Sequence, residues 1–439
     1  MSLGKTPRAN RIHIGIFGRR NAGKSSLINA ITGQDTALVS DTPGTTTDPV
    51  YKSMELHGAG PVVFIDTPGI DDIGDLGRAR ANRALRVLGR TDVAVLIVDP
   101  MQGFGEPEEN LLRQLLSRSV PVVTVVGKQD GWVRASCLED VTSEVQAVFR
   151  ESGVGSFQKT GKPGYKQVIA SGGETISGPW LCGVSAVTGQ GISELTSRLC
   201  KIIKDELGDM EPAIAGDLLE PGDTVFLVVP LDLQAPKGRL ILPQVQTIRD
   251  LLDHDCVAVM AKTADFAGAL QNSKHPPSLV ITDSQVFQEV DTILPADIPL
   301  TSFSILFARH KGDLHALAQG ARVLGQLKPR DKVLIAEACT HHPIEDDIGR
   351  VKIPRWLEEK VGGPLDFSWQ RGVDYPVNLR EFKVIIHCGG CMLNRRAMLS
   401  RIDAANAAGV PITNYGMTIA YTKGILERAL KPFGYDSRP

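Results

Sequence analysis

The chain has 439 residues, which predicts two to four domains, and its 42% hydrophobic and 22% charged residues are typical of a soluble globular protein. Its net charge of −2 excludes a strong basic field that would attract nucleic acid. The sequence shows no signal peptide and no apolar run of roughly 20 residues, so we expect no membrane partner. Seven cysteines are too few for a disulfide scaffold in so long a chain, so we expect reduced thiols and a cytoplasmic location.

The first 205 residues alternate between predicted strands and predicted helices. Nearly continuous apolar runs predict strands at 12–17, 62–65, 93–98 and 120–126. Helices are expected between them at 25–31, 79–88 and 108–116. Such runs are typical of strands that are buried on both faces of a parallel sheet. The pattern predicts a doubly wound, mostly parallel α/β domain over residues 1–208.

The remaining sequence predicts two smaller α/β domains, at 216–312 and 313–439. Strands are expected at 224–231, 257–260, 279–282, 333–336 and 384–387. Helices are expected at 243–253, 264–271, 284–291, 314–327, 395–408 and 418–429. We recognise no internal sequence repeat.

A phosphate-binding motif follows the first predicted strand. Residues 18–25, GRRNAGKS, fit G-x-x-x-x-G-K-[ST] between a strand and a helix. Backbone N–H groups of such a loop, together with the helix N-terminus, bind phosphate. Lys24 would reach the β- and γ-phosphates and Ser25 would bind Mg²⁺. The predicted nucleotide ligands of this segment are Gly18, Asn21, Ala22, Gly23, Lys24, Ser25 and Ser26.

Downstream motifs occur in the order that a guanine-nucleotide site requires. Asp66 and Gly69, in DTPG, would hold Mg²⁺ and meet the γ-phosphate, and Thr46 is the expected switch threonine. Lys128 and Asp130, in GKQD, would recognise guanine, and Ser185 and Ala186 would cover the base. We therefore expect Lys24, Thr46 and Gly69 to serve GTP hydrolysis, and Ser25, Thr46 and Asp66 to hold Mg²⁺.

The GTP-binding residues resemble the Era and TrmE type of GTPase over about residues 10–205. Gly127 stands where that family has an asparagine that braces the base, which implies weaker nucleotide binding. Ile70 stands where Ras-like proteins orient the attacking water with glutamine, which implies slow unaided hydrolysis. Asn21 matches the loop asparagine that helps to bind K⁺ in potassium-activated relatives.

Cysteine and histidine residues gather near the C-terminus, after two predicted strands. They occur as Cys339-x-His341 and His387-Cys388-x-x-Cys391. Three thiolates can hold three irons of a 4Fe-4S cluster, and three thiolates with one histidine can equally make a closed zinc site. For a cluster, the candidate ligands of the fourth iron are His341, His387, Glu345, Asp346 and Asp347.

The combination of this cysteine pattern with an Era-like GTPase resembles the HydF family of FeFe-hydrogenase maturation GTPases along nearly the whole chain. The resemblance implies a dimerisation domain, a cluster domain that can support tetramers, and a 4Fe-4S cluster on Cys339, Cys388 and Cys391. It also implies a GTP-hydrolysing scaffold that receives a di-iron precursor from two radical-SAM maturases and delivers it to apo-hydrogenase. The alternatives are a ribosome-assembly or tRNA-modifying GTPase with a structural zinc domain, and a redox enzyme.

Overall fold

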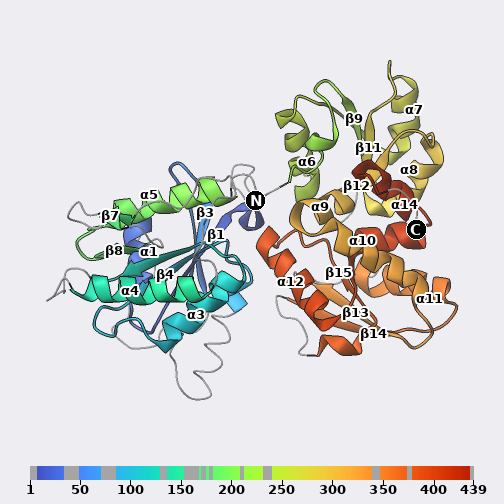
Figure 1. Cartoon of the computed structure of the whole chain (residues 1–439). Helices are drawn as coiled ribbons and strands as arrows, with labels where there is room; N and C mark the ends of the chain where they lie inside the picture. The colour runs from blue at the N-terminus through green and yellow to red at the C-terminus, as the bar shows by residue number, and fades with distance from the viewer. Residues whose placement is uncertain are drawn as a thin grey trace. The chain divides into compact units, whose positions relative to one another are not determined.

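The computed structural model describes most of the chain: residues 7–33, 49–70, 86–128, 136–152, 168–169, 175–176, 181–207, 212–230, 240–338, 347–372 and 378–435. They form two compact units, Met1–Met210 and Glu211–Pro439 (Figure 1). The predicted boundary between residues 312 and 313 lies inside the second unit. No helix among the described residues is long and apolar enough to cross a membrane.

The first unit is built on a six-stranded sheet in the order β2-β3-β1-β4-β5-β8. Its strands are β1 (Ile12–Gly18), β2 (Val50–Leu56), β3 (Gly60–Asp66), β4 (Val93–Val98), β5 (Val122–Val126) and β8 (Leu181–Gly183). Strand β2 is antiparallel to β3, and the other neighbours in this sheet are parallel. The predicted doubly wound, mostly parallel sheet is confirmed, although β2 and β8 were not predicted.

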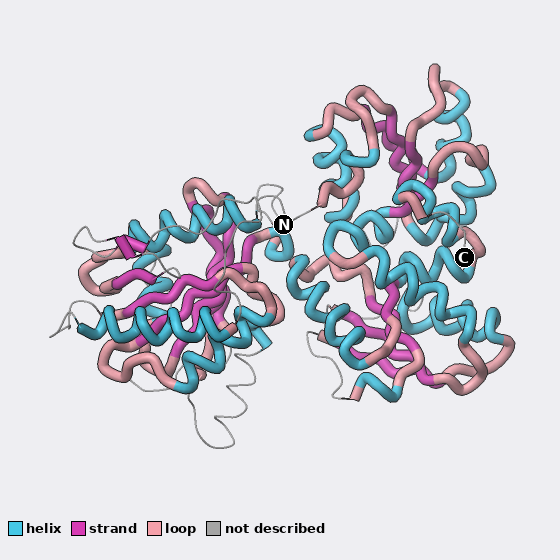
Figure 2. The backbone as a smooth tube through the Cα atoms, in the orientation of Figure 1, coloured by secondary structure: helices cyan, strands magenta, loops and turns pink. Residues whose placement is uncertain are grey.

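Helices cover both faces of this sheet (Figure 2). They are α1 (Lys24–Thr32), α3 (Glu106–Ser117), α4 (Ser136–Glu151) and α5 (Ile192–Ile202). Buried residues of α1 and α5 share one apolar cluster with the sheet, and those of α3 and α4 share another. A small antiparallel pair, β6 (Val168–Ile169) and β7 (Thr175–Ile176), is also present. Because both faces are covered, the sheet places its functional groups at the carboxyl ends of its strands.

The second unit contains two four-stranded parallel sheets with the same strand order. The first is β10-β9-β11-β12, and the second is β14-β13-β15-β16. Their strands are β9 (Thr224–Val229), β10 (Val257–Lys262), β11 (Leu279–Thr282), β12 (Leu300–Ser302), β13 (Lys332–Glu337), β14 (Asp366–Arg371), β15 (Val384–His387) and β16 (Ile412–Asn414). The predicted α/β character of this region is confirmed. The repeated topology was missed, because no matching sequence pattern accompanies it.

The helices of the second unit alternate with its strands, except between β14 and β15, where the described residues form only the short turn Leu379–Glu381. They are α6 (Leu242–Asp253), α7 (Phe266–Gln271), α8 (Phe287–Ile293), α9 (Phe303–Lys311), α10 (Leu314–Val323), α11 (Ile353–Val361), α12 (Arg395–Ala408), α13 (Tyr415–Thr422) and α14 (Leu426–Leu430). The prediction of one helix at 418–429 was wrong. Gly424, with φ of +75°, separates α13 from α14, because this left-handed conformation does not continue a right-handed helix.

Short helical turns complete the described backbone. They lie at Arg8–Asn10, Ile203–Leu207, Gly216–Leu218, Thr263–Asp265, Ser284–Val286, Leu324–Gln326, Ile348–Lys352, Leu379–Glu381 and Lys431–Phe433.

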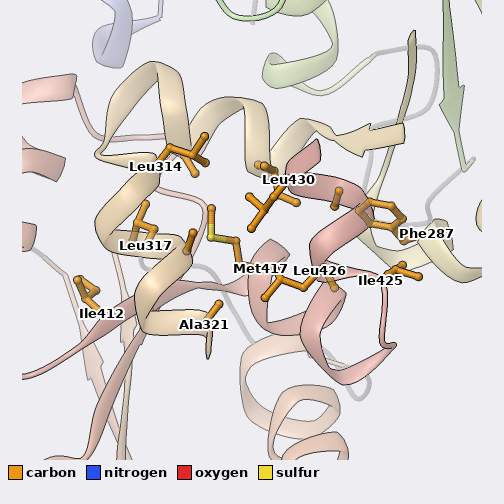
Figure 3. Packing of buried hydrophobic residues seen from close by; sticks show 14 of the residues in the cluster. Phe287, Leu314, Leu317, Ala321, Ile412, Met417, Ile425, Leu426 and Leu430 are labelled. Carbon is orange, nitrogen blue, oxygen red and sulfur yellow. The ribbon is translucent and has the colours of Figure 1, made fainter. Parts of the chain in front are cut away.

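The two sheets of the second unit exchange helices. Helix α10, which follows the first sheet, packs on β16 of the second, so closely that a Cβ on Gly320 would lie 1.9 Å from the carbonyl oxygen of Ile412. Helix α14, which follows the second sheet, lies beside β12 of the first, where Thr301 Oγ1 donates to the carbonyl of Ala429 at 3.1 Å. One buried apolar cluster therefore joins both halves; Figure 3 labels Phe287, Leu314, Leu317, Ala321, Ile412, Met417, Ile425, Leu426 and Leu430.

Candidate nucleotide site and cysteine site

The phosphate-binding motif lies between the end of β1 and the start of α1. This segment holds the predicted ligands Gly18, Asn21, Ala22, Gly23, Lys24, Ser25 and Ser26. Gly18 and Gly23 have φ of +152° and +98°, which glycine adopts without steric cost, and Asn21 has φ of +59°. The loop therefore reaches the helix N-terminus in a conformation suited to phosphate binding.

Lys24 is the first residue of α1 and is buried. Its Nζ donates hydrogen bonds to the carbonyl oxygens of Gly18 at 3.0 Å and Arg19 at 2.6 Å. These carbonyls hold the ammonium inside its own loop. The same ammonium can donate to phosphate oxygens that enter the loop, which is the chemistry predicted for Lys24.

Ser25 and Asp66 converge from α1 and from the end of β3. Ser25 Oγ donates to Asp66 Oδ2 at 2.5 Å, and the other carboxylate oxygen, Oδ1, is buried with no hydrogen-bond partner. A buried carboxylate oxygen without a partner is costly, and a divalent cation or its bound water would satisfy it. A hydroxyl and a carboxylate are oxygen ligands of the kind that Mg²⁺ prefers, so these residues fit a Mg²⁺ site.

Burial raises the pKa of Asp66, although the hydrogen bond from Ser25 and the charges of Lys24 and Lys52 act in the opposite direction. A carboxyl whose folded pKa is raised destabilises the fold when it is charged, and this penalty disappears as the pH falls through the folded pKa. We therefore expect Asp66→Asn to raise the melting temperature of the nucleotide-free protein at pH 7 by a few degrees. The gain should shrink towards pH 5. Scanning calorimetry without Mg²⁺ and nucleotide measures it, and a lower melting temperature at pH 7 would contradict this account.

Gly69 follows β3 and approaches the phosphate loop closely. A Cβ built on Gly69 would lie 2.9 Å from the backbone nitrogen of Arg20 and 3.1 Å from its Cα. A larger residue would push the two segments apart, so glycine is needed for this approach. Ile70, which stands where Ras-like proteins have glutamine, packs against the apolar cluster of the sheet.

The predicted base-binding residues follow two neighbouring strands, β5 and β8. Lys128 Nζ is 2.7 Å from Oδ2 of the buried Asp99, and Ser185 is fully buried and accepts from Thr188 N at 3.1 Å. Ala186 follows Ser185 in the same turn. A Cβ on Gly127 would lie 3.2 Å from the carbonyl oxygen of Ala22. Position 127 thus faces the phosphate loop.

Sequence reasoning missed an ion pair that fixes the phosphate loop. Arg19 Nη2 is 2.7 Å from Oε2 of Glu108, which is buried near the start of α3. The same oxygen accepts from Gly105 N at 3.1 Å. The pair joins residues 89 positions apart, so no local pattern could have indicated it.

The cysteine site lies at the carboxyl ends of β13 and β15, which are parallel neighbours. Cys388 directly follows β15; its backbone N–H donates to Ala336 O at 2.8 Å, and its Sγ accepts from Ala338 N at 3.2 Å. Backbone N–H bonds of this kind stabilise a thiolate or a metal-bound sulfur. Burial raises the pKa of Cys391, with a further increase from Cys388, so the two thiols act on one another electrostatically.

Both ring nitrogens of the buried His387 are engaged. Nδ1 bonds to the carbonyl oxygen of Cys388 at 2.6 Å, and Nε2 is 2.5 Å from Arg401 Nη1. Arg401 Nη2 donates in turn to Gly372 O at 2.5 Å. The carbonyl can only accept, so Nδ1 carries the proton and Nε2 accepts from Arg401. A metal-ligand role for His387 would require one of these bonds to break.

A second polar group lies beside Cys388. The buried Glu337, at the end of β13, pairs with Arg371 at 3.1 Å and accepts from the hydroxyl of Tyr415 at 3.3 Å. Burial raises the pKa of Tyr415, and Cys388, Glu337 and Asp347 raise it further. Tyr415 is therefore held protonated as a donor next to the cysteine loop.

Several predicted site residues lie outside the described residues. They are Thr46, Asp130, Cys339, His341, Glu345 and Asp346. Among the residues that the structure describes, no three His, Cys, Asp or Glu side chains are grouped so that they could hold a metal ion. The predicted ligand set of the cluster therefore stays a prediction.

Family models match three consecutive parts of the chain. A 50S ribosome-binding GTPase model matches residues 13–128, a hydrogen maturase F dimerization domain matches 214–312, and a hydrogen maturase F tetramerization domain matches 315–432. The chain belongs to the HydF-type hydrogenase maturase GTPases. A GTPase domain of this type binds GTP or GDP with Mg²⁺ and supports GTP hydrolysis. The two HydF domains support oligomerisation.

Curated relatives resemble the GTPase part of this HydF-type chain. GTPase Der of Wolinella succinogenes is 35% identical over 144 residues, which cover 32% of this chain and 30% of that protein. GTPase Der of Maridesulfovibrio salexigens is 39% identical over 126 residues, 28% of each chain. The chain thus spans less than a third of the length of these relatives.

Solved structures of Era are also similar to this HydF-type chain. Aquifex aeolicus Era bound to GDP and aluminium fluoride has 19% sequence identity and a TM-score of 0.33, covering 57% of this chain and 92% of that one. Era in complex with MgGDPNP and a 16S ribosomal RNA fragment has 18% identity and a TM-score of 0.34, covering 57% and 91%. Scores this low decide nothing about function.

Proposed function

We propose that this chain is a GTP-hydrolysing scaffold that binds a 4Fe-4S cluster and assembles or delivers a di-iron precursor for apo FeFe-hydrogenase. Two radical-SAM maturases are the expected partners, in the cytoplasm. The observation that carries the proposal is the Ala338 N–H to Cys388 Sγ bond, which ties the ends of β13 and β15 together at a sulfur. The match to the two HydF domains supports the same reading.

In the GTPase unit, Lys24 would neutralise the β- and γ-phosphates, and Ser25 with Asp66 would hold Mg²⁺. Gly69 would offer its N–H to the γ-phosphate, because its close approach to the phosphate loop brings the backbone to that side. Thr46 would complete the Mg²⁺ site, while Asp130 with Lys128 would recognise guanine. GTP would act as a conformational signal to partners rather than as the source of the cluster chemistry.

In the cysteine site, Cys339, Cys388 and Cys391 would hold three irons. Cys339 is the next residue in the sequence after Ala338, whose N–H bonds to Cys388 Sγ. Cys388 and Cys391 fit this role, because their thiols interact electrostatically and the Cys388 sulfur accepts a backbone N–H.

The fourth iron would then take an exchangeable ligand. We favour His341, Glu345 and Asp346 as candidates, since His387 already uses both ring nitrogens. Asp347 Oδ1 accepts from the backbone N–H groups of Gly349 and Arg350 at the start of a helical turn. We propose that His387 instead braces the carbonyl of Cys388 against Arg401. A replaceable ligand is what a carrier of a di-iron cargo requires.

The test is anaerobic reconstitution of the full chain with iron and sulfide. We expect about four irons and four sulfides per chain, as a 4Fe-4S cluster requires, with its EPR signal after reduction. Purification with one stoichiometric zinc and no uptake of iron would overturn the proposal. That result would favour the alternative of a structural zinc domain.

K⁺ is a second expected cofactor of the GTPase unit. Asn21 holds a left-handed conformation at the turn of the phosphate loop, where its side-chain oxygen can serve a cation beside the phosphates. We expect KCl to raise the rate of GTP hydrolysis several-fold over NaCl, and Asn21→Ala to remove that difference. A phosphate-release assay in the two salts at equal ionic strength measures it, and equal rates in the wild type would remove the role of Asn21.

A homodimer would use the β10 edge of the first sheet in the second unit. Strand β10 is at the end of this sheet, and exposed apolar side chains cover it and α6: Val245, Leu252, Val257 and Met260. Apolar edges of this kind mark association surfaces. Leu252→Glu, at a side chain 57% exposed, should shift the chain towards monomer by light scattering. Val187→Glu, at an exposed apolar residue of the first unit, is the control, and equal shifts would contradict this interface.

A further inference from the structure

The loop that carries Cys388 and Cys391 is attached to a helix of the other sheet. Lys311 is the last residue of α9, which follows the first sheet of the second unit. Its side chain is 4% exposed, and its Nζ donates to the carbonyl oxygens of Cys391 at 3.3 Å and Leu393 at 3.1 Å. A positive charge from residue 311 is therefore buried against the backbone carbonyl of the second cysteine.

The attachment is reciprocal. Arg395 lies in the first turn of α12, just after the cysteine loop, and its Nη1 donates to three carbonyls at the end of α9: Arg309 at 3.3 Å, His310 at 2.6 Å and Gly312 at 3.1 Å. Carbonyls at the C-terminus of a helix have no donor within the helix, and a cation is favourable there. Five hydrogen bonds thus join α9 to the segment 391–395, and they fix the position of Lys311.

The charge of Lys311 lies against the backbone of the cysteine loop. Its Nζ is within hydrogen-bond distance of the carbonyl oxygens of Cys391 and Leu393, so the ammonium is held close to any group that Cys388 and Cys391 bind. A buried ammonium also gains from a nearby anion, since water does not compensate its charge.

We propose that Lys311 is a positioning residue that fixes the Cys388–Cys391 loop and raises the reduction potential of the iron–sulfur cluster bound there. The inference rests on the cluster site proposed above. Reduction adds one negative charge to a cluster, and a fixed positive charge stabilises the reduced form more than the oxidised form. Net charge, hydrogen bonds and solvent exposure are the factors that set such potentials. Lys311 supplies the first of these, a positive charge, from a helix outside the cysteine-bearing half, and its hydrogen bonds to loop carbonyls hold that charge in place.

The experiment is an EPR-monitored redox titration of reconstituted wild type, Lys311→Met, Lys311→Gln and Lys311→Arg. Methionine and glutamine remove the charge at similar volume, and arginine keeps it. Lys332→Met, at an exposed lysine at the start of β13, is a control for the loss of a distant charge. Circular dichroism verifies that each variant is folded.

We expect a lower midpoint potential in Lys311→Met and Lys311→Gln, and wild-type values in Lys311→Arg and Lys332→Met. Loss of the cluster from both neutral variants but not from Lys311→Arg would support the same role. An unchanged midpoint potential in a folded neutral variant would overturn the proposal. Cluster loss or misfolding in all three Lys311 variants would also overturn it, because that result would indicate that Lys311 acts through packing rather than through its charge. If wild type itself binds no cluster, the proposed function fails instead.

Discussion

Lys24→Ala should lower kcat for GTP hydrolysis by about 100-fold or more. Lys24 is buried at the start of α1, and its ammonium is held by the carbonyls of Gly18 and Arg19 in the position that the phosphates would approach. Removing one preorganised group that stabilises transition-state charge typically costs 10²–10³ in rate. A phosphate-release assay under saturating GTP measures the effect.

The matched control is Lys201→Ala, at an exposed lysine of α5 in the same unit. It should hydrolyse GTP at the wild-type rate. The iron content of Lys24→Ala after reconstitution should also equal that of wild type, because the cysteines belong to the other compact unit. Parallel loss of GTP hydrolysis and iron would show that the two sites do not act independently.

Cys388→Ser should remove the iron–sulfur cluster, so that iron falls from about four per chain towards zero, given the four-iron cluster type proposed here. Cys388 accepts a hydrogen bond from Ala338 at the junction of β13 and β15, and serine replaces its thiolate with a poorly ionised hydroxyl. Cys391→Ser should act in the same direction. Iron and sulfide analysis with the ultraviolet–visible spectrum provides the measurement.

Cys256→Ser is the control for loss of a thiol. Cys256 is buried in the same unit, and its Sγ lies 3.7 Å from the carbonyl oxygen of Glu220 and 3.5 Å from that of His254, contacts that a serine hydroxyl can replace. It should keep the full cluster. Retention of four irons in Cys388→Ser would exclude this cysteine as a ligand and reopen the choice of ligand set.

Buried strands were the features that the sequence predicted best. The bounds predicted at 93–98, 279–282 and 384–387 are those of β4, β11 and β15 in the structure, because each strand is an apolar run, which Thr282 ends in β11 and His387 ends in β15. The phosphate loop could be predicted equally well, since its chemistry requires glycines and a lysine at fixed spacing. Both signals are local in the sequence.

Contacts between distant segments could not be predicted in this way. Nothing in the sequence near Lys311 indicates that it lies against Cys391, 80 positions away, and Arg401 shows no local sign of its bond to His387. The break between α13 and α14 was missed for a different reason: one glycine, Gly424, is tolerated within helices, and its effect here depends on the packing of α14 against β12.

The exchanged helices α10 and α14 bear on how the second unit unfolds. Unfolding of the first sheet would remove β12, against which α14 packs. Unfolding of the second sheet would remove β16, against which α10 packs. Neither sheet can melt while the other keeps a complete core, because the buried cluster draws residues from both. Residues 211–439 should therefore behave as one cooperative folding unit, in which stabilisation of the cysteine-bearing half also protects the half that carries the proposed dimer edge.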